Sequence, residues 1–182
     1  MYKNIFVLNT GRCGSTTFSK ACTHFNNYTS GHETRSRFIG DIRFSYPAYH
    51  IEADNRLSWL LGRLERSYGD SAFYVHLERD AESTARSYAK RKGGIMASYR
   101  GGGIIMGCKE TDNLVIAMDY VDTVTENIRS FLANKSHKLN FRLENAKVDF
   151  PHFIEMVGAK GSLDLALAEF DVRHNATLMG PP

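Results

Sequence analysis

Residues 10–17 read Thr-Gly-Arg-Cys-Gly-Ser-Thr-Thr and bring together the chemical groups that bind an oxyanion. Glycines let backbone N–H groups approach an anion, and Arg12 adds a planar fork of donors that suits a phosphate. An apolar run at residues 5–8 precedes this segment and is typical of a buried strand. A helix beginning after it would direct the positive end of its dipole at the anion. The pattern predicts an anion-binding loop made by Gly11, Arg12, Cys13, Gly14, Ser15, Thr16 and Thr17.

A second junction between a strand and a helix lies at residues 72–88. Its apolar run ends at Arg79, and Asp80 is placed to cap the helix that follows. Ser83 and Ser87 are four residues apart and therefore share one face of that helix. Arg79 and Ser87 are placed to hold one phosphate between them. Together with the first loop, this junction predicts a ligand that carries two separated phosphate groups.

At these positions the chain resembles the sulfotransferases that use PAPS (3′-phosphoadenosine 5′-phosphosulfate). In that family a strand–loop–helix near the N-terminus binds the 5′-phosphosulfate, which corresponds to residues 11–17 here. A second strand–helix carries an Arg and, eight residues later, a Ser for the 3′-phosphate, which correspond to Arg79 and Ser87. Residues 141–153 look like the family's closing strand and helix, and Arg173 matches a basic C-terminal loop that folds over the nucleotide. The resemblance implies PAPS as co-substrate and PAP, its desulfated form, as product.

The implied reaction is the transfer of a sulfuryl group to an acceptor hydroxyl or amine, in which Arg12 would stabilise the leaving phosphate. A base must take the acceptor's proton. Glu33 is the preferred candidate, because its Glu-Thr-Arg run looks like that of the tyrosylprotein members of the family. His32 is the alternative, and His50 or Glu52 is a third possibility. This chemistry needs no metal ion, and no metal site is expected.

Two other functions compete with this interpretation. A P-loop kinase or NTPase would carry Gly-x4-Gly-Lys-Ser/Thr, whereas this loop has two residues between its glycines and no Lys after the second. A catalytically inactive nucleotide-binding protein would keep the loop and lose the base. Cys13 follows a strand and precedes a helix, where a thiol can have a lowered pKa. A phosphatase loop is excluded, because Cys-x5-Arg would need an arginine where the chain has Ser19.

Length and composition fit one domain over residues 1–182. A net charge of +3 is too small to indicate a nucleic-acid partner. Three cysteines cannot all pair internally, which favours a reducing compartment and a cytoplasmic location. No apolar run reaches the ~18 residues of a membrane span. The acceptor could be a sugar, a lipid, a small molecule or a peptide, and the oligomeric state stays open.

Strand and helix patterns alternate along the chain, which predicts an α/β fold with a three-layer parallel sheet flanked by helices, of the P-loop nucleotide-binding-like type. Residues 28–47 are expected to be irregular with one short strand, and the glycine-rich residues 93–103 to form a mobile loop. The remaining expected elements are a helix at 57–68, a long amphipathic helix at 114–132, a strand at 139–143, and short helices at 150–157 and 163–170.

Overall fold

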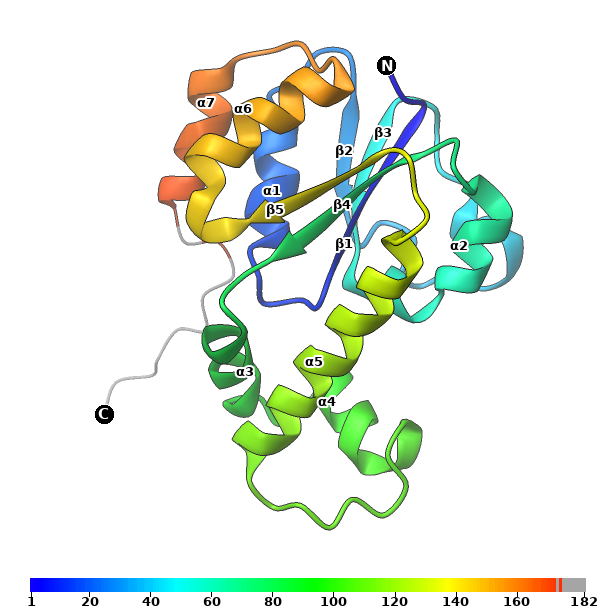
Figure 1. Ribbon diagram of the computed structural model, residues 1–182, viewed down its shortest axis with the longest axis vertical. Coiled ribbons are helices and arrows are strands. Elements are labelled where there is room, and N and C mark those ends of the chain that lie inside the picture. The colour runs from blue at the N-terminus through cyan, green and yellow to red at the C-terminus, as the bar shows by residue number, and fades with distance from the viewer. Residues whose placement is uncertain (173, 175–182) are drawn as a thin grey trace.

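A computed structural model describes residues 1–172 and 174 (Figure 1). Its centre is a five-stranded sheet in the order β2-β3-β1-β4-β5, in which every neighbouring pair is parallel. All strands therefore end at the same edge of the sheet. The strands are β1 (Asn4–Asn9), β2 (Thr29–His32), β3 (His50–Ala53), β4 (Phe73–Glu78) and β5 (Lys138–Arg142).

Helices cover both faces of this sheet and complete three layers, which confirms the predicted α/β fold (Figure 1). One face is packed by α1 (Ser15–Cys22), α6 (Ala146–Val157) and α7 (Leu163–Ala168). The other is packed by α2 (Leu61–Tyr68), α3 (Ala81–Ala89), α4 (Ile95–Ser98) and α5 (Asn113–Leu132). Short helical turns are η1 (Gly40–Phe44), η2 (Asn55–Trp59), η3 (Tyr99–Gly103), η4 (Leu143–Asn145) and η5 (Glu169–Asp171).

The central strand β1 feeds both hydrophobic cores because successive side chains of a strand point to opposite faces. Ile5 and Val7 enter the core beneath α1, whereas Phe6 and Leu8 enter the core beneath α3 and α5. All six residues of β1 are buried, as expected for the middle strand of a parallel sheet. The position of the loop that follows β1 is consequently fixed from two sides. Within residues 1–172, no helix has the length and apolarity to cross a bilayer.

Strand β3 does not follow from the sequence pattern, since His50 and Glu52 are polar. In the fold both side chains are buried, and His50 Nε2 lies 3.0 Å from Glu52 Oε2. This internal pairing makes their burial tolerable. The helix expected at residues 57–68 is interrupted as well. Leu60 leaves the helical region (φ −123°, ψ 25°) and separates the turn η2 from α2.

The expectation of a mobile loop at residues 93–103 is wrong for its central part, which forms α4 and the π-helical turn η3. Met96 and Tyr99 are buried in the core beneath α3 and α5. The hydroxyl of Tyr99 also donates to Asp119 Oδ2 on α5 at 2.6 Å. Two buried anchors thus hold a segment whose glycines suggested mobility. The predicted long helix, last strand and final helices are confirmed, with boundaries that differ by a few residues.

Candidate functional site

The predicted anion-binding loop lies between β1 and α1, at the edge where all the strands end. Gly11 and Gly14 adopt φ values of 81° and 91°, and Arg12 itself has a φ of 59°. The side chain of Asn9 shapes the turn, because its Oδ1 accepts the Gly11 N–H at 2.8 Å. Gly14 stands at the N-cap of α1 and has no side chain to offer. The first N–H groups of α1 are therefore suited to an external anion.

Two buried tyrosines are hydrogen-bonded to the start of this loop. The Thr10 carbonyl accepts hydrogen bonds from the Tyr88 hydroxyl at 2.7 Å and from the Tyr120 hydroxyl at 2.8 Å. Gly11 lies so close to Tyr88 that a Cβ at this position would be 2.1 Å from the Tyr88 oxygen. The loop is thereby tied to α3 and α5. Neither tyrosine could be assigned this role from the sequence, because contacts between residues 78 and 110 positions apart leave no local signal.

Arginine side chains from separate segments meet at the loop, as the two-phosphate hypothesis requires. Arg12 Nε donates to Ser87 Oγ at 3.0 Å, and Arg79 Nη1 donates to the Arg12 carbonyl at 3.3 Å. Burial lowers the pKa of Arg12, and the positive charges of Arg91 and Arg79 lower it further. We call Arg12, Arg79 and Arg91 the cationic cluster. Like charges held together in this way favour the binding of a polyanion.

His32 contacts the first turn of α1 directly. Its Nε2 lies 3.0 Å from Ser15 Oγ and 3.4 Å from Thr16 Oγ1. Thr17, the third predicted hydroxyl, is buried within α1. His32 ends β2, so this strand places an imidazole beside the predicted loop. Of the base candidates, His32 is thus hydrogen-bonded to the loop hydroxyls themselves.

Glu33 follows His32 immediately, at the same edge of the sheet. It adopts a left-handed φ of 55°, and its N–H donates to the Ala53 carbonyl at 3.0 Å. Its Oε2 lies 2.5 Å from Arg56 Nη1 in an ion pair, and the side chain is 32% exposed. A carboxylate that is oriented by a partner and still reached by solvent is able to accept a proton from a bound acceptor.

The third candidate pair, His50 and Glu52, is placed differently. Glu52 is fully buried and accepts from the Thr34 N–H at 2.7 Å, the Thr34 hydroxyl at 2.6 Å and His50 Nε2. His50 Nδ1 lies 2.8 Å from the Thr29 hydroxyl. With all these partners in place, Glu52 fixes the turn after β2. These contacts hold Thr34, the residue next to Glu33.

Cys13 is completely buried, and burial raises its pKa to about 12. This result corrects the idea that its place beside a helix N-terminus would lower the pKa. We expect Cys13, and the equally buried Cys22, to resist alkylation in the native protein, whereas the partly exposed Cys108 reacts first. Mass spectrometry after a short N-ethylmaleimide pulse, with unfolded protein as control, measures the order. Early labelling of Cys13 would contradict the buried loop geometry.

Two other predicted features remain. Arg173 lies outside the described residues. Among residues 1–172 and 174, no group of three or more His, Cys, Asp and Glu side chains is arranged to hold a metal ion.

Comparisons with known proteins bear on the fold. No family model and no curated protein sequence matches this chain. Among solved structures, the chain is similar to a sulfotransferase domain from the curacin biosynthetic pathway, with a TM-score of 0.69 and 13% sequence identity. The match covers 91% of this chain and 77% of that domain. Since the identity is so low, the likeness concerns the fold, and the fold of this protein resembles that of a sulfotransferase domain.

Proposed function

We propose that the protein transfers a sulfuryl group from PAPS to a hydroxyl or amine of an acceptor and releases PAP. The observation that carries the proposal is the contact between the two predicted phosphate sites. Arg12 of the loop is hydrogen-bonded to Ser87, and Arg79 is hydrogen-bonded to the Arg12 carbonyl. The similarity in fold to a sulfotransferase domain supports the same conclusion.

The residues at this edge of the sheet suit a ligand with phosphates at both ends of one nucleoside. Within the described residues, Arg79 and Arg91 form no ion pair with a carboxylate, so their charges remain available to a ligand. Ser87 is partly exposed and can donate its hydroxyl proton to a phosphate. The N-terminus of α1, which lacks a side-chain cap, supplies backbone donors beside the cationic cluster.

Each group then has a part in the reaction. Arg12 and the loop N–H groups stabilise the charge that develops on the leaving phosphate oxygen as its bond to sulfur breaks. Arg79 and Ser87 hold the 3′-phosphate. Glu33 takes the proton of the acceptor as the new bond between the acceptor and sulfur forms. Arg12 stays protonated throughout, so its contribution is electrostatic.

Thermal unfolding with nucleotides tests the donor site. We expect PAP to raise the midpoint temperature of unfolding by much more than AMP, ADP or ATP does at the same concentration. A ligand at about a hundred times its Kd adds about 2.7 kcal/mol of stability. Ser87→Ala and Arg79→Gln should remove most of the advantage of PAP over AMP. Arg66→Gln is the matched control, because Arg66 is an exposed arginine of α2.

Other outcomes would contradict the proposal. A larger effect from ATP than from PAP would favour the P-loop kinase or NTPase. Stabilisation by PAP without transfer to any acceptor in a broad screen would favour a catalytically inactive binding protein. If none of the nucleotides shifts the midpoint, the two-phosphate site is wrong.

A further inference from the structure

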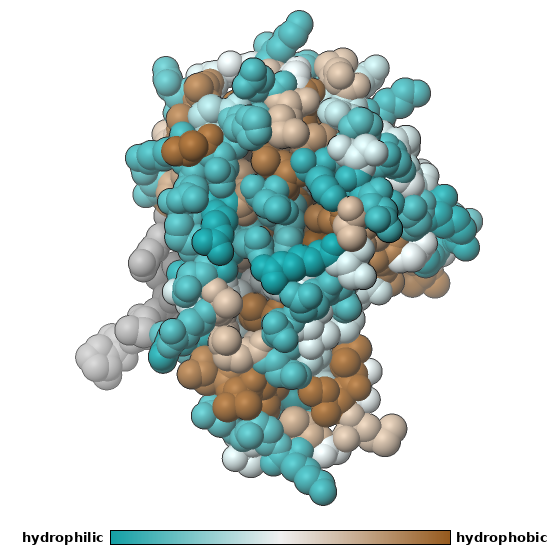
Figure 2. All heavy atoms as spheres, in the orientation of Figure 1, coloured by the Kyte–Doolittle hydropathy of each residue, from teal (hydrophilic) through white to brown (hydrophobic). Residues whose placement is uncertain are grey.

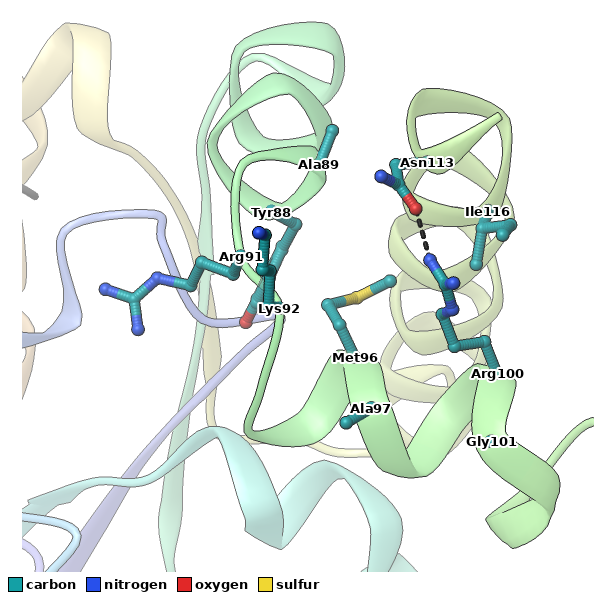
Figure 3. Close-up of a pocket in the computed structure, with 10 residues that line it drawn as sticks. All are labelled: Tyr88, Ala89, Arg91, Lys92, Met96, Ala97, Arg100, Gly101, Asn113 and Ile116. Carbon is teal, nitrogen blue, oxygen red and sulfur yellow. Dashed lines mark hydrogen bonds between the residues drawn. The ribbon is translucent and has the colours of Figure 1, made fainter. Parts of the chain in front are cut away.

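A pocket of about 390 Å³ lies where α3, α4 and α5 meet (Figure 3). Its volume falls in the range of sites that bind small organic molecules. The apolar part of its lining includes Ala89 of α3, Met96 and Ala97 of α4, and Ile116 of α5. Of the residues that line the pocket, Arg91 alone belongs to the cationic cluster of the proposed donor site.

The rim of the pocket is positively charged. Arg91, Lys92 and Arg100 all line it, and none of its lining residues in the described part of the chain is acidic. Arg100 is hydrogen-bonded to Asn113 at the beginning of α5 (Figure 3). A cationic rim above an apolar floor fits a ligand that has an apolar body and an anionic group.

The pocket adjoins the cationic cluster through α3. Ser87, which accepts from Arg12, lies on this helix, and Arg91 follows the end of the helix by two residues, with its N–H donating to the Tyr88 carbonyl at 2.8 Å. Figure 3 shows the Arg91 guanidinium directed away from Met96 and toward the segment that follows β1. Its charge also lowers the pKa of Arg12. Arg91 thus stands between the pocket and the predicted donor loop.

The surface around the pocket is also partly apolar. Figure 2 shows hydrophobic side chains gathered over the region of α4 and the beginning of α5. Ile104 and Met106, which follow η3, and Val115 of α5 are exposed, at 54%, 90% and 50% of their surface. An acceptor with an apolar body would find contacts both in the pocket and beside it.

We propose that this pocket binds the acceptor and that the acceptor is an amphiphilic anion, held by Lys92 and Arg100 with its nucleophilic group toward Arg91 and the loop. The identity of the pocket as an acceptor site rests on the proposed function. Its preference for an anion with an apolar body rests on the lining alone. The positive rim also offsets the repulsion between an anionic acceptor and an anionic donor.

Binding of matched probes tests the preference without any turnover. Calorimetric titration of the full chain would compare 3-(4-hydroxyphenyl)propionate with its amide and with tyramine, and octanoate with octanamide. We expect each carboxylate to bind at least about tenfold more tightly than its amide, as charge-assisted hydrogen bonds predict. In the Lys92→Gln/Arg100→Gln double variant this ratio should fall toward one. Arg66→Gln, an exposed charge on α2, should leave it unchanged.

A single variant and a measurement with PAP bound complete the test. Lys92→Gln alone provides a second variant, because Lys92 is exposed and its loss does not disturb the core. PAP-saturated protein should retain the carboxylate preference, since the donor and acceptor sites are distinct. Equal binding of acid and amide, no saturable binding of either acid, an unchanged ratio in the double variant, or displacement by PAP would each overturn the inference.

The two proposals can fail separately. If the pocket prefers carboxylates but PAP does not stabilise the protein, the inferred ligand class of the pocket stands and the proposal of PAPS as sulfuryl donor is wrong. If PAP stabilises the protein but the pocket does not prefer carboxylates, the proposed donor site stands and the proposed acceptor class is wrong.

Discussion

Glu33→Gln is expected to lower kcat for sulfuryl transfer by about 10²–10⁴-fold while PAP affinity changes by less than about twofold. Glutamine keeps the shape of the side chain and a hydrogen bond to Arg56, but it cannot take the proton of the acceptor. The measurement is a single-turnover rate with PAPS and the best acceptor found by screening, paired with a PAP titration of the same preparation.

Two further variants are needed to interpret the activity of Glu33→Gln. Asp41→Asn is a control, because this carboxylate is 95% exposed and pairs with Arg63 and Arg66 on α2. His32→Gln separates the two candidates for the base. Full activity of Glu33→Gln together with an inactive His32→Gln would move the role of base to His32, which lies against the hydroxyls of Ser15 and Thr16.

Gly11→Ala is expected to destabilise the fold by about 2–5 kcal/mol and to abolish stabilisation by PAP. The residue has a φ of 81°, and a Cβ would lie 2.1 Å from the Tyr88 oxygen and 2.7 Å from Asn55 Nδ2. Tyr88 cannot withdraw without giving up its hydrogen bond to the Thr10 carbonyl. The anion-binding loop must therefore move. Urea unfolding with and without PAP measures both effects.

A matched glycine separates backbone strain from crowding. Gly40 has a φ of 66°, yet a Cβ there would meet no atom within 4 Å. Gly40→Ala therefore has the cost of a positive φ without a clash with neighbouring atoms, and we expect it to retain PAP binding. If Gly11→Ala bound PAP as tightly as the unaltered protein, the loop would not be the donor site.

The parts of the fold that the sequence predicts are those with a local pattern. A run of apolar residues followed by Gly-x-x-Gly placed β1, the loop and α1 correctly, and the run before Arg79 placed β4 and α3. In both cases strand, turn and helix signals are contiguous, so no distant partner is needed to interpret them.

The elements that escaped prediction depend on partners far along the chain. Strand β3 is hidden because His50 and Glu52 look exposed in the sequence, whereas in the fold they are bonded to Thr29 and Thr34, which are 21 and 18 residues away. The glycines around Met96 and Tyr99 suggest a mobile segment in the sequence. In the fold, these two side chains are buried in the core beneath α5 and keep the segment in place. The site shows the same division, since the residues of the loop were predictable whereas the tyrosines that hold it were not.

The way in which residues 91–101 are attached has a consequence for how such a protein can diversify. Met96 and Tyr99 are buried in the core and Ile95 packs against it, whereas Lys92, Arg100 and the glycines at positions 93, 94 and 101 are exposed. A Cβ added at any of these three glycines would meet no neighbouring atom. Substitutions at positions 93 and 101 therefore meet no neighbour, whereas Gly94, with a φ of 69°, would carry a backbone cost. Changes at these positions would alter the lining of the pocket and leave the hydrogen bonds from Tyr88 and Tyr120 to the loop after β1 in place.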